Sequence, residues 1–203
     1  MIGEMLCSIV KFISGAHARW VDCPCEDKQR IYFANHSSHL DAFVLWAVLP
    51  SEIRQKTKVV GAKDYWEKTG LRRFISLKVY NPLLIDRNQN VTPEDPRHPI
   101  NQILKVLEDA YSIIIFPEGT RNAEEGVKPF KSGIYYLALK KPDIELIPVY
   151  LENLNRILPK GEILFVPIIG SVVFGSPIKI YPGESKEGFL KRAEEAILSL
   201  EEK

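Results

Sequence analysis

Short apolar runs alternate with longer amphipathic stretches along this chain, and no other feature limits its possible folds as strongly. The apolar runs have the length of buried strands, which are predicted at 30–34, 58–62, 83–86, 112–116, 145–150, 163–167 and 178–181. Helical periodicity predicts helices at 41–49, 64–77, 99–110 and 133–140, with a last helix after Ser185. Strands that alternate with helices predict a layered α/β/α domain with a largely parallel or mixed central sheet.

Composition narrows the class of protein further. The chain has 203 residues, 45% of them hydrophobic and 26% charged, which is enough for one domain with a buried core. Its net charge of +1 argues against a dedicated nucleic-acid-binding protein, and no nucleic-acid partner is expected. No uncharged apolar run reaches about 18 residues, which argues against a conventional spanning helix. The cysteines, Cys7, Cys23 and Cys25, are too few for a disulfide framework and are expected to be free thiols.

The N-terminal segment is predicted to be an amphipathic helix over residues 1–20. Such a helix can fold over the core, or it can lie in the plane of a membrane with Trp20 as an interfacial aromatic residue. The predicted division is therefore an amphipathic helix over 1–22, a possible membrane anchor, and a folded domain over 23–203. The polar segment 88–99 is expected to be a surface loop of that domain.

The densest polar cluster, residues 35–41, directly follows a predicted strand and precedes a predicted helix. His36 and Asp41 can fold back on one another there, and a carboxylate on one imidazole nitrogen leaves the other free as a general base. Such a pair lacks a nucleophile of its own, so the substrate would supply the hydroxyl. Two alternatives remain open at this point. Ser38 and Asp41 fit a helix capping box, and His36, His39 and Asp41 could bind a metal.

A second cluster occupies residues 116–121, again at the end of an apolar run. Gly119 permits a tight turn with the backbone close to a ligand, and Arg121 presents a planar fork suited to a phosphate. The simpler alternative is a strand-to-loop turn with an exposed ion pair of Glu118 and Arg121. A third strand end, at 85–87, also carries an arginine.

Together these segments resemble the sequence blocks of the glycerolipid acyltransferases, the family of 1-acylglycerol-3-phosphate acyltransferase. The blocks are Asn35-His36-x4-Asp41, Ile85-Asp86-Arg87, Phe116-Pro117-Glu118-Gly119-Thr120-Arg121 and Ile147-Pro148-Val149, in that order. Phe130-Lys131-Ser132-Gly133 also resembles the stretch that follows the family's third block. The His-x4-Asp spacing is weak alone, but it is specific when a Pro-Glu-Gly-Thr-Arg block follows about 80 residues later.

The resemblance implies an O-acyltransferase that needs no metal and no cofactor, with an acyl-CoA or acyl-carrier-protein thioester as donor. His36 would deprotonate the hydroxyl of a lysophospholipid acceptor, which then attacks the thioester without a covalent enzyme intermediate. Asp41 would orient His36 and stabilise the imidazolium. No Gly-x-Ser-x-Gly elbow and no P-loop occur in the sequence, which argues against a serine hydrolase and a P-loop nucleotidase.

The resemblance also implies a phosphate site for the acceptor, in which Arg87 and Arg121 hold the phosphate. The substrate-binding positions carried over are Arg87, Glu118, Gly119, Thr120, Arg121 and, at a looser spacing, Lys63. The apolar residues Phe43, Leu45 and Trp46 could line an acyl groove or pack in the core.

Local charge favours a membrane partner. Residues 54–87 hold nine basic and three acidic side chains, and clustered Lys and Arg attract anionic lipid headgroups. The expectation is a peripheral protein on the cytoplasmic face of a membrane. The alternatives are another acceptor (glycerol 3-phosphate or an amino-lipid), a metal-dependent hydrolase, or a non-catalytic membrane-binding module.

Overall fold

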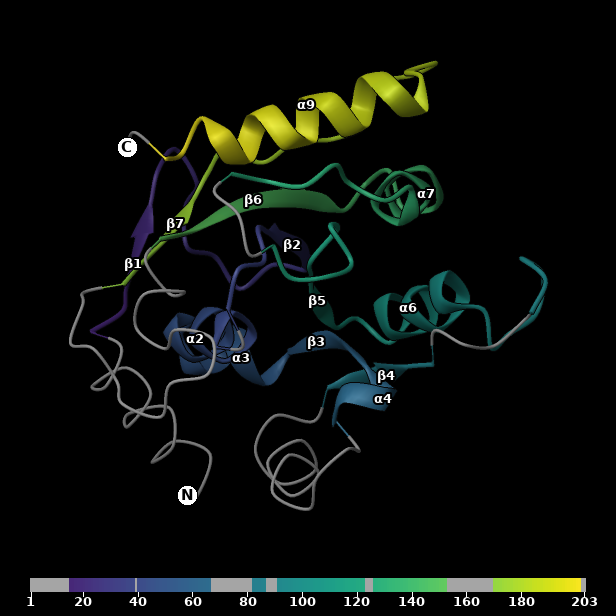
Figure 1. Cartoon of the computed structure of the whole chain (residues 1–203), viewed down its shortest axis with the longest axis horizontal. Helices are drawn as coiled ribbons and strands as arrows, with labels where there is room; N and C mark the ends of the chain where they lie inside the picture. The colour runs from purple at the N-terminus through teal and green to yellow at the C-terminus, as the bar shows by residue number, and fades with distance from the viewer. Residues whose placement is uncertain are drawn as a thin grey trace.

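A seven-stranded sheet forms the centre of the molecule (Figure 1). The computed structural model describes residues 15–38, 40–66, 82–86, 91–122, 126–152 and 170–201. The strands are β1 (His17–Trp20), β2 (Arg30–Ala34), β3 (Thr57–Ala62), β4 (Leu83–Ile85), β5 (Ser112–Ile115), β6 (Glu145–Glu152) and β7 (Ser171–Phe174). They lie in the order β1-β7-β6-β2-β5-β3-β4.

The sheet is mixed and mostly parallel, which confirms the predicted fold class. Strands β6, β2, β5, β3 and β4 are parallel to one another, whereas β7 is antiparallel to β6 and β1 is parallel to β7. All five residues of β2 are buried between β5 and β6. Because parallel strands end at the same edge of a sheet, the loops after β2 and β5 leave the sheet side by side.

Helices cover both faces of the sheet. One face carries α2 (Asp41–Val48), α3 (Ser51–Gln55) and α4 (Lys63–Trp66), and the other carries α6 (Pro99–Glu108), α7 (Gly133–Lys140) and α9 (Lys186–Leu198). Alternate residues of β2 serve the two cores. Tyr32 and Ala34 pack toward α2, and Ile31 and Phe33 pack toward α7 and α9. Burial on both faces explains the unbroken apolar run of this strand.

The helices begin where local chemistry satisfies their first backbone groups. The Ser185 hydroxyl accepts a hydrogen bond from the Gly188 N–H at the start of α9. His98 caps α6 in the same way, and Pro99 occupies the first turn. None of the helices within the described ranges is long and apolar enough to cross a membrane.

The N-terminal prediction is wrong for residues 17–20, which form the edge strand β1 rather than the end of a helix. The Trp20 ring lies flat on Phe174 of β7, with ring centroids 3.9 Å apart, so Trp20 packs on the sheet rather than at the end of a helix. The backbone of β7 pairs with β1, and this long-range pairing outweighs the local helical periodicity. The boundary predicted at residue 22 therefore falls inside the folded domain, while residues 1–14 lie outside the described residues.

Other differences also involve short elements. The strand β7 and the five-residue helix α3 were not predicted, and the strand predicted at 178–181 is reduced to a single bridge between Ile178 and Leu146. Of the helix predicted over 64–77, only residues 64–66 are described, and they belong to α4, which begins one residue earlier at Lys63. The strand predicted at 163–167 lies outside the described residues.

A buried cation fixes the amino ends of the central strands. Arg30 is 1% exposed, and its Nε donates to Glu145 Oε2 at 3.2 Å, which joins the first residues of β2 and β6. Its other nitrogens donate to the Pro24 carbonyl and to Glu26. Lys28 bonds the second oxygen of Glu145 from the solvent side at 2.7 Å. A buried guanidinium needs such partners, because an isolated charge costs several kcal/mol to desolvate.

Replacing Glu145 with alanine is expected to lower the free energy of unfolding by about 3 to 5 kcal/mol at neutral pH. The substitution leaves the Arg30 guanidinium buried without its closest carboxylate, and urea denaturation measures the loss. Lys28→Ala is the matched control, because it removes an exposed partner of the same carboxylate and should cost about 0 to 1 kcal/mol.

The comparison of wild type with Glu145→Ala also gives a test of pH dependence. Hydrogen bonds, first from Lys28 and then from Arg30, hold the pKa of Glu145 below its ordinary value of 4.5, against the opposing effect of its burial. A carboxyl with a depressed pKa stabilises the fold above its unfolded pKa and loses that contribution as the pH falls through the folded pKa. The stability gap between wild type and Glu145→Ala should therefore narrow on acidification, and a gap independent of pH would contradict this role.

Candidate active site

The candidate site lies where the loops after β2 and β5 meet. Asn35, the first residue beyond β2, continues the pairing with β6 through its side chain. Its Nδ2 donates to the Leu151 carbonyl at 3.1 Å, and its Oδ1 accepts from the Leu151 N–H at 2.7 Å. The chain therefore leaves the sheet at a fixed point, one residue before His36.

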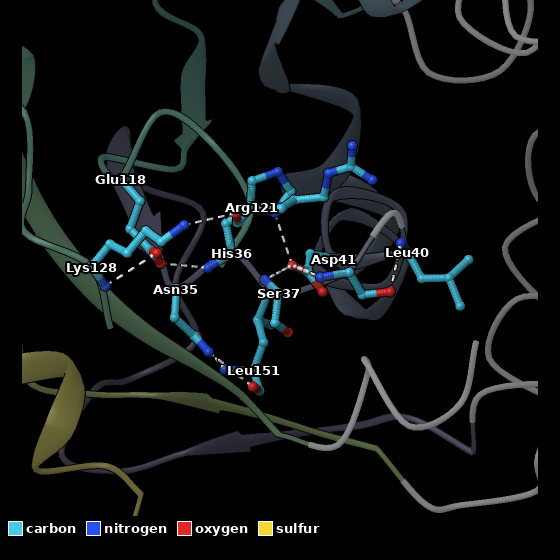
Figure 2. A network of polar contacts seen from close by, with 10 residues as sticks. Asn35, His36, Ser37, Leu40, Asp41, Glu118, Arg121, Lys128 and Leu151 are labelled. Carbon is cyan, nitrogen blue, oxygen red and sulfur yellow. Dashed lines mark hydrogen bonds and ion pairs between the residues drawn. The ribbon is translucent and has the colours of Figure 1, made fainter. Parts of the chain in front are cut away.

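His36 and Asp41 form the contact expected from their spacing. His36 Nδ1 lies 2.8 Å from Asp41 Oδ2, and the same oxygen accepts from the backbone N–H groups of Ser37 and Ser38 (Figure 2). Asp41 is 0% exposed, whereas His36 is 21% exposed. Because a carboxylate oxygen is an acceptor, Nδ1 carries the hydrogen and the lone pair of neutral His36 is on Nε2.

The capping alternative is realised only in part. Asp41 reaches back to the Ser38 N–H, as the second half of a capping box would. The Ser38 hydroxyl, however, accepts from the Leu40 N–H at 3.2 Å, and Leu40 is the N-cap of α2 without a side-chain cap. The Asp41 carboxylate thus serves both the turn and the imidazole, so capping alone does not account for it.

Glu118 holds the backbone of His36 from the neighbouring loop. Its Oε1 accepts from the His36 N–H at 2.7 Å and its Oε2 accepts from the Lys128 N–H at 3.2 Å. Glu118 is 3% exposed, and burial raises the pKa of its carboxyl, although the two backbone hydrogen bonds oppose the rise. The exposed ion pair considered for this turn is therefore wrong, because Glu118 bonds to backbone groups inside the protein.

The loop after β5 surrounds the His36 residue. The Phe116 ring stacks on the imidazole with centroids 4.3 Å apart, and the Asn122 N–H donates to the His36 carbonyl at 2.6 Å. The Lys128 ammonium donates to the Arg121 carbonyl, which ties this loop to the segment that follows it (Figure 2). The two hydrogen bonds could not be predicted from sequence, because Asn122 and Arg121 act there through backbone groups that every residue type carries.

A cleft of about 560 Å³, here called the central cleft, extends from His36 along the carboxyl ends of β3 and β5. Its wall is largely apolar and includes Val60, Ile85, Ile103, Ile115, Ile134 and Leu137. These residues belong to β3, β4, β5, α6 and α7. Of Phe43, Leu45 and Trp46, the last two are core residues, as the packing alternative expected, and among the described residues α2 contributes only Ala42 to the wall of the central cleft.

The predicted substrate-binding residues are distributed unevenly about this cleft. Gly119, Thr120 and Arg121 line it, and the Arg121 guanidinium lies 5.6 Å from the centre of the Tyr65 ring. Glu118 does not line the cleft; it is buried and holds the backbone of His36 and Lys128. Lys63 is exposed at the start of α4 and is not among the lining residues, and Arg87 lies outside the described residues.

Two further lining residues, Lys131 and Asp64, were given no role from the sequence. The sequence could have pointed to Lys131, because it belongs to the segment 130–133, which resembles the stretch after the family's third block. For the metal alternative, the described ranges contain no group of three or more His, Cys, Asp or Glu placed to hold an ion. Of the three proposed ligands, His39 lies outside the described residues, and His36 and Asp41 bond to each other.

A polar pair oriented at the carboxyl ends of parallel strands, beside a large apolar cleft, is the usual arrangement of a ligand site in an α/β protein. Sequence comparison identifies the family to which the protein belongs. The profile of the acyltransferase family matches residues 19–152, and the chain therefore belongs to the acyltransferase family.

Relatives and a solved structure agree with this assignment. The chain is 27% identical over 179 residues to the 1-acyl-sn-glycerol-3-phosphate acyltransferase of Limnanthes douglasii, an alignment that covers 88% of this chain and 60% of that protein. It is 28% identical over 144 residues to the enzyme of the same name from Haemophilus influenzae, covering 66% of this chain and 55% of that protein. The chain thus spans little more than half the length of these relatives.

The crystal structure of the 1-acyl-sn-glycerophosphate acyltransferase of Thermotoga maritima has the same fold. It superposes with a TM-score of 0.73 over 98% of this chain and 77% of that one, at 21% sequence identity.

Proposed function

We propose that this protein is an O-acyltransferase that moves a fatty acyl group from a CoA or acyl-carrier-protein thioester to the hydroxyl of lysophosphatidic acid. One observation carries the proposal. The His36 imidazole lines the central cleft, and Asp41 bonds its Nδ1 at 2.8 Å, so Nε2 is left to accept a proton. The activity in the names of the relatives supports the choice of reaction and acceptor.

The reaction follows from the chemistry of this pair. His36 Nε2 takes the proton of the acceptor hydroxyl as the oxygen bonds to the thioester carbonyl carbon. The tetrahedral intermediate then collapses, the carbon–sulfur bond breaks, and the imidazolium returns the proton to the thiolate. Asp41 stabilises the imidazolium throughout through the hydrogen bond to Nδ1. A thioester is already activated, so the enzyme needs no nucleophile of its own.

The two ends of the lipid substrates match the two parts of the central cleft. The apolar wall suits a fatty acyl chain, because each buried methylene gains about 0.8 kcal/mol. The acceptor's phosphate would lie at Arg121, whose guanidinium is exposed at the cleft and oriented over Tyr65. Arg87 stays a predicted second contact. Lys63 is a weaker candidate, because it does not line the cleft.

Asp41→Asn is expected to lower kcat by about 100- to 10,000-fold, because the charge that stabilises the imidazolium is lost while the side-chain shape is kept. His36→Ala should abolish transfer while leaving the thermal unfolding midpoint within a few degrees of wild type. Product formation from radiolabelled acyl-CoA and lysophosphatidic acid measures both. If Asp41→Asn retained nearly full kcat and lost only stability, Asp41 would be a helix cap and the proposed mechanism would fail.

The same assay separates the alternatives. Transfer that survives a chelator supports the His36–Asp41 mechanism, whereas chelator-sensitive hydrolysis of the thioester would indicate a metal-dependent hydrolase. Binding to vesicles with neither reaction would indicate a non-catalytic membrane module. A mixture of lysophosphatidic acid, glycerol 3-phosphate and an amino-lipid, with product identification, then tests the acceptor.

Arg121→Ala is expected to raise the KM for lysophosphatidic acid by about 10-fold or more, because a charge-assisted hydrogen bond to phosphate contributes about 1.5 to 3 kcal/mol. Monoacylglycerol has the same chain and hydroxyl but no phosphate, so its KM should be unchanged. An equal rise for both acceptors would show that the loss comes from disturbed packing on Tyr65 rather than from a missing phosphate contact.

We also propose attachment to a membrane surface with anionic lipid, on the cytoplasmic face. The basic segment 54–87 and the amphipathic pattern of residues 1–14 support it. Arg54, however, is buried and donates to the carbonyls of Ala47 and Leu49, so it is not available to lipid. The other basic residues of this segment and the N-terminal segment would therefore supply the affinity.

Deleting residues 1–14 is expected to reduce binding to vesicles with anionic lipid by about 10-fold or more, which is about 1.4 kcal/mol. The deletion stops before β1, so the sheet edge that starts at His17 is retained. Vesicle co-sedimentation measures the bound fraction, and circular dichroism checks the fold. Unchanged sedimentation of the shortened chain would place the membrane contact elsewhere.

A further inference from the structure

We infer that Lys131 is a phosphate-binding residue of the central cleft, a second cation that acts beside Arg121. The inference rests on the proposed function for the identity of the lipid, but the binding of phosphate can be tested without it. Neither the spacing of the sequence blocks nor the family resemblance assigns this lysine a role.

The Lys131 side chain lies across Gly119. Gly119 has a φ of +73°, and a Cβ built there would be 2.7 Å from Lys131 Cε and 2.8 Å from its Nζ. Both contacts are closer than a real Cβ tolerates, so the lysine occupies the space that a side chain at this position would need. The glycine is therefore required by its positive φ, and the flexible end of the lysine would have to move for any side chain at this position.

The position of Lys131 is fixed from its backbone. Its N–H donates to the Pro117 carbonyl at 2.9 Å, inside the turn that carries Gly119. The preceding residue, Phe130, is buried against the Phe33 ring, and its N–H donates to Glu194 Oε1 at 2.7 Å. The lysine thus projects from an anchored segment. Phe116, which precedes the Pro117 to which its N–H bonds, stacks on the His36 ring.

Charge identifies the ligand class. Asp64 is the one carboxylate among the described residues that line the central cleft, against the two cations Arg121 and Lys131. No described residue bonds the Lys131 ammonium, in contrast to Lys128, whose ammonium donates to the Arg121 carbonyl. A phosphate monoester carries close to two negative charges at neutral pH and is bound best by more than one cation. Arg121 and Lys131 line the same cleft and supply two.

The test compares Lys131→Ala and Lys131→Arg with Lys140→Ala. Lys140 is an exposed lysine at the far end of α7 that does not line the cleft. Thermal shift and calorimetry with inorganic phosphate measure binding directly. Steady-state kinetics with lysophosphatidic acid, monoacylglycerol and acyl-CoA measure which substrate loses affinity.

Lys131→Ala is expected to weaken phosphate binding and to raise the KM for the phosphorylated substrate by about 10- to 100-fold, with kcat changed less. Lys131→Arg should restore most of the loss, and Lys140→Ala should match wild type. A rise confined to lysophosphatidic acid assigns the phosphate to the acceptor, and a rise confined to acyl-CoA assigns it to the donor. Unchanged phosphate binding and unchanged KM values for both would overturn the inference.

Gly119→Ala gives a second, independent variant. Its methyl group must displace the end of the Lys131 chain, so it should raise the KM in wild type and raise it less in Lys131→Ala, where only the strain of the positive φ remains. Full additivity would contradict the packing of the lysine on the glycine. If the wild-type protein transfers no acyl group but binds phosphate through Lys131, the proposed function fails and the phosphate site stands.

Discussion

The Asp41 carboxylate is the interaction on which the rest of the site depends. One buried oxygen accepts hydrogen bonds from the His36 ring and from the backbone of Ser37 and Ser38, and so it fixes the turn and the imidazole at once. Glu118, a second buried carboxylate, holds the His36 N–H from the loop after β5. The histidine is thus positioned both by its ring and by its backbone, which limits the rotamers open to it. Buried carboxylates are stable only when such donors surround them.

The parallel core of the sheet explains why these groups meet. His36 and Glu118 are 82 residues apart in sequence, but β2 and β5 are adjacent parallel strands and end at the same edge. At the opposite edge, Arg30 and Glu145 join the first residues of β2 and β6. The central strands are therefore held at both ends, by a structural ion pair at one and by the candidate site at the other. The separation leaves the carboxyl edge free for a ligand.

The two helical layers have different uses. The helix α2 is apolar on nearly every side, and its Leu45 and Trp46 are taken up by the core, so α2 contributes little to the ligand site. The central cleft lies at the carboxyl ends of β3 and β5, between α4 from one layer and α6 and α7 from the other. Family membership and the relatives' names point to a lipid substrate, for which a largely apolar cleft beside a polar pair is suited.

Local pattern in the sequence was enough to predict several elements. The bounds of β2 and α7 were predicted to the residue, because an unbroken apolar run and a 3.6-residue period are local properties. The contact of His36 with Asp41 was predictable for the same reason, since only four residues separate them in the chain. The tertiary structure alone decided that residues 17–20 pair with β7, that Glu118 is buried, and where the cleft lies. These outcomes depend on pairing between distant segments, whose free energy competes with local preference and leaves no periodic signal in the sequence.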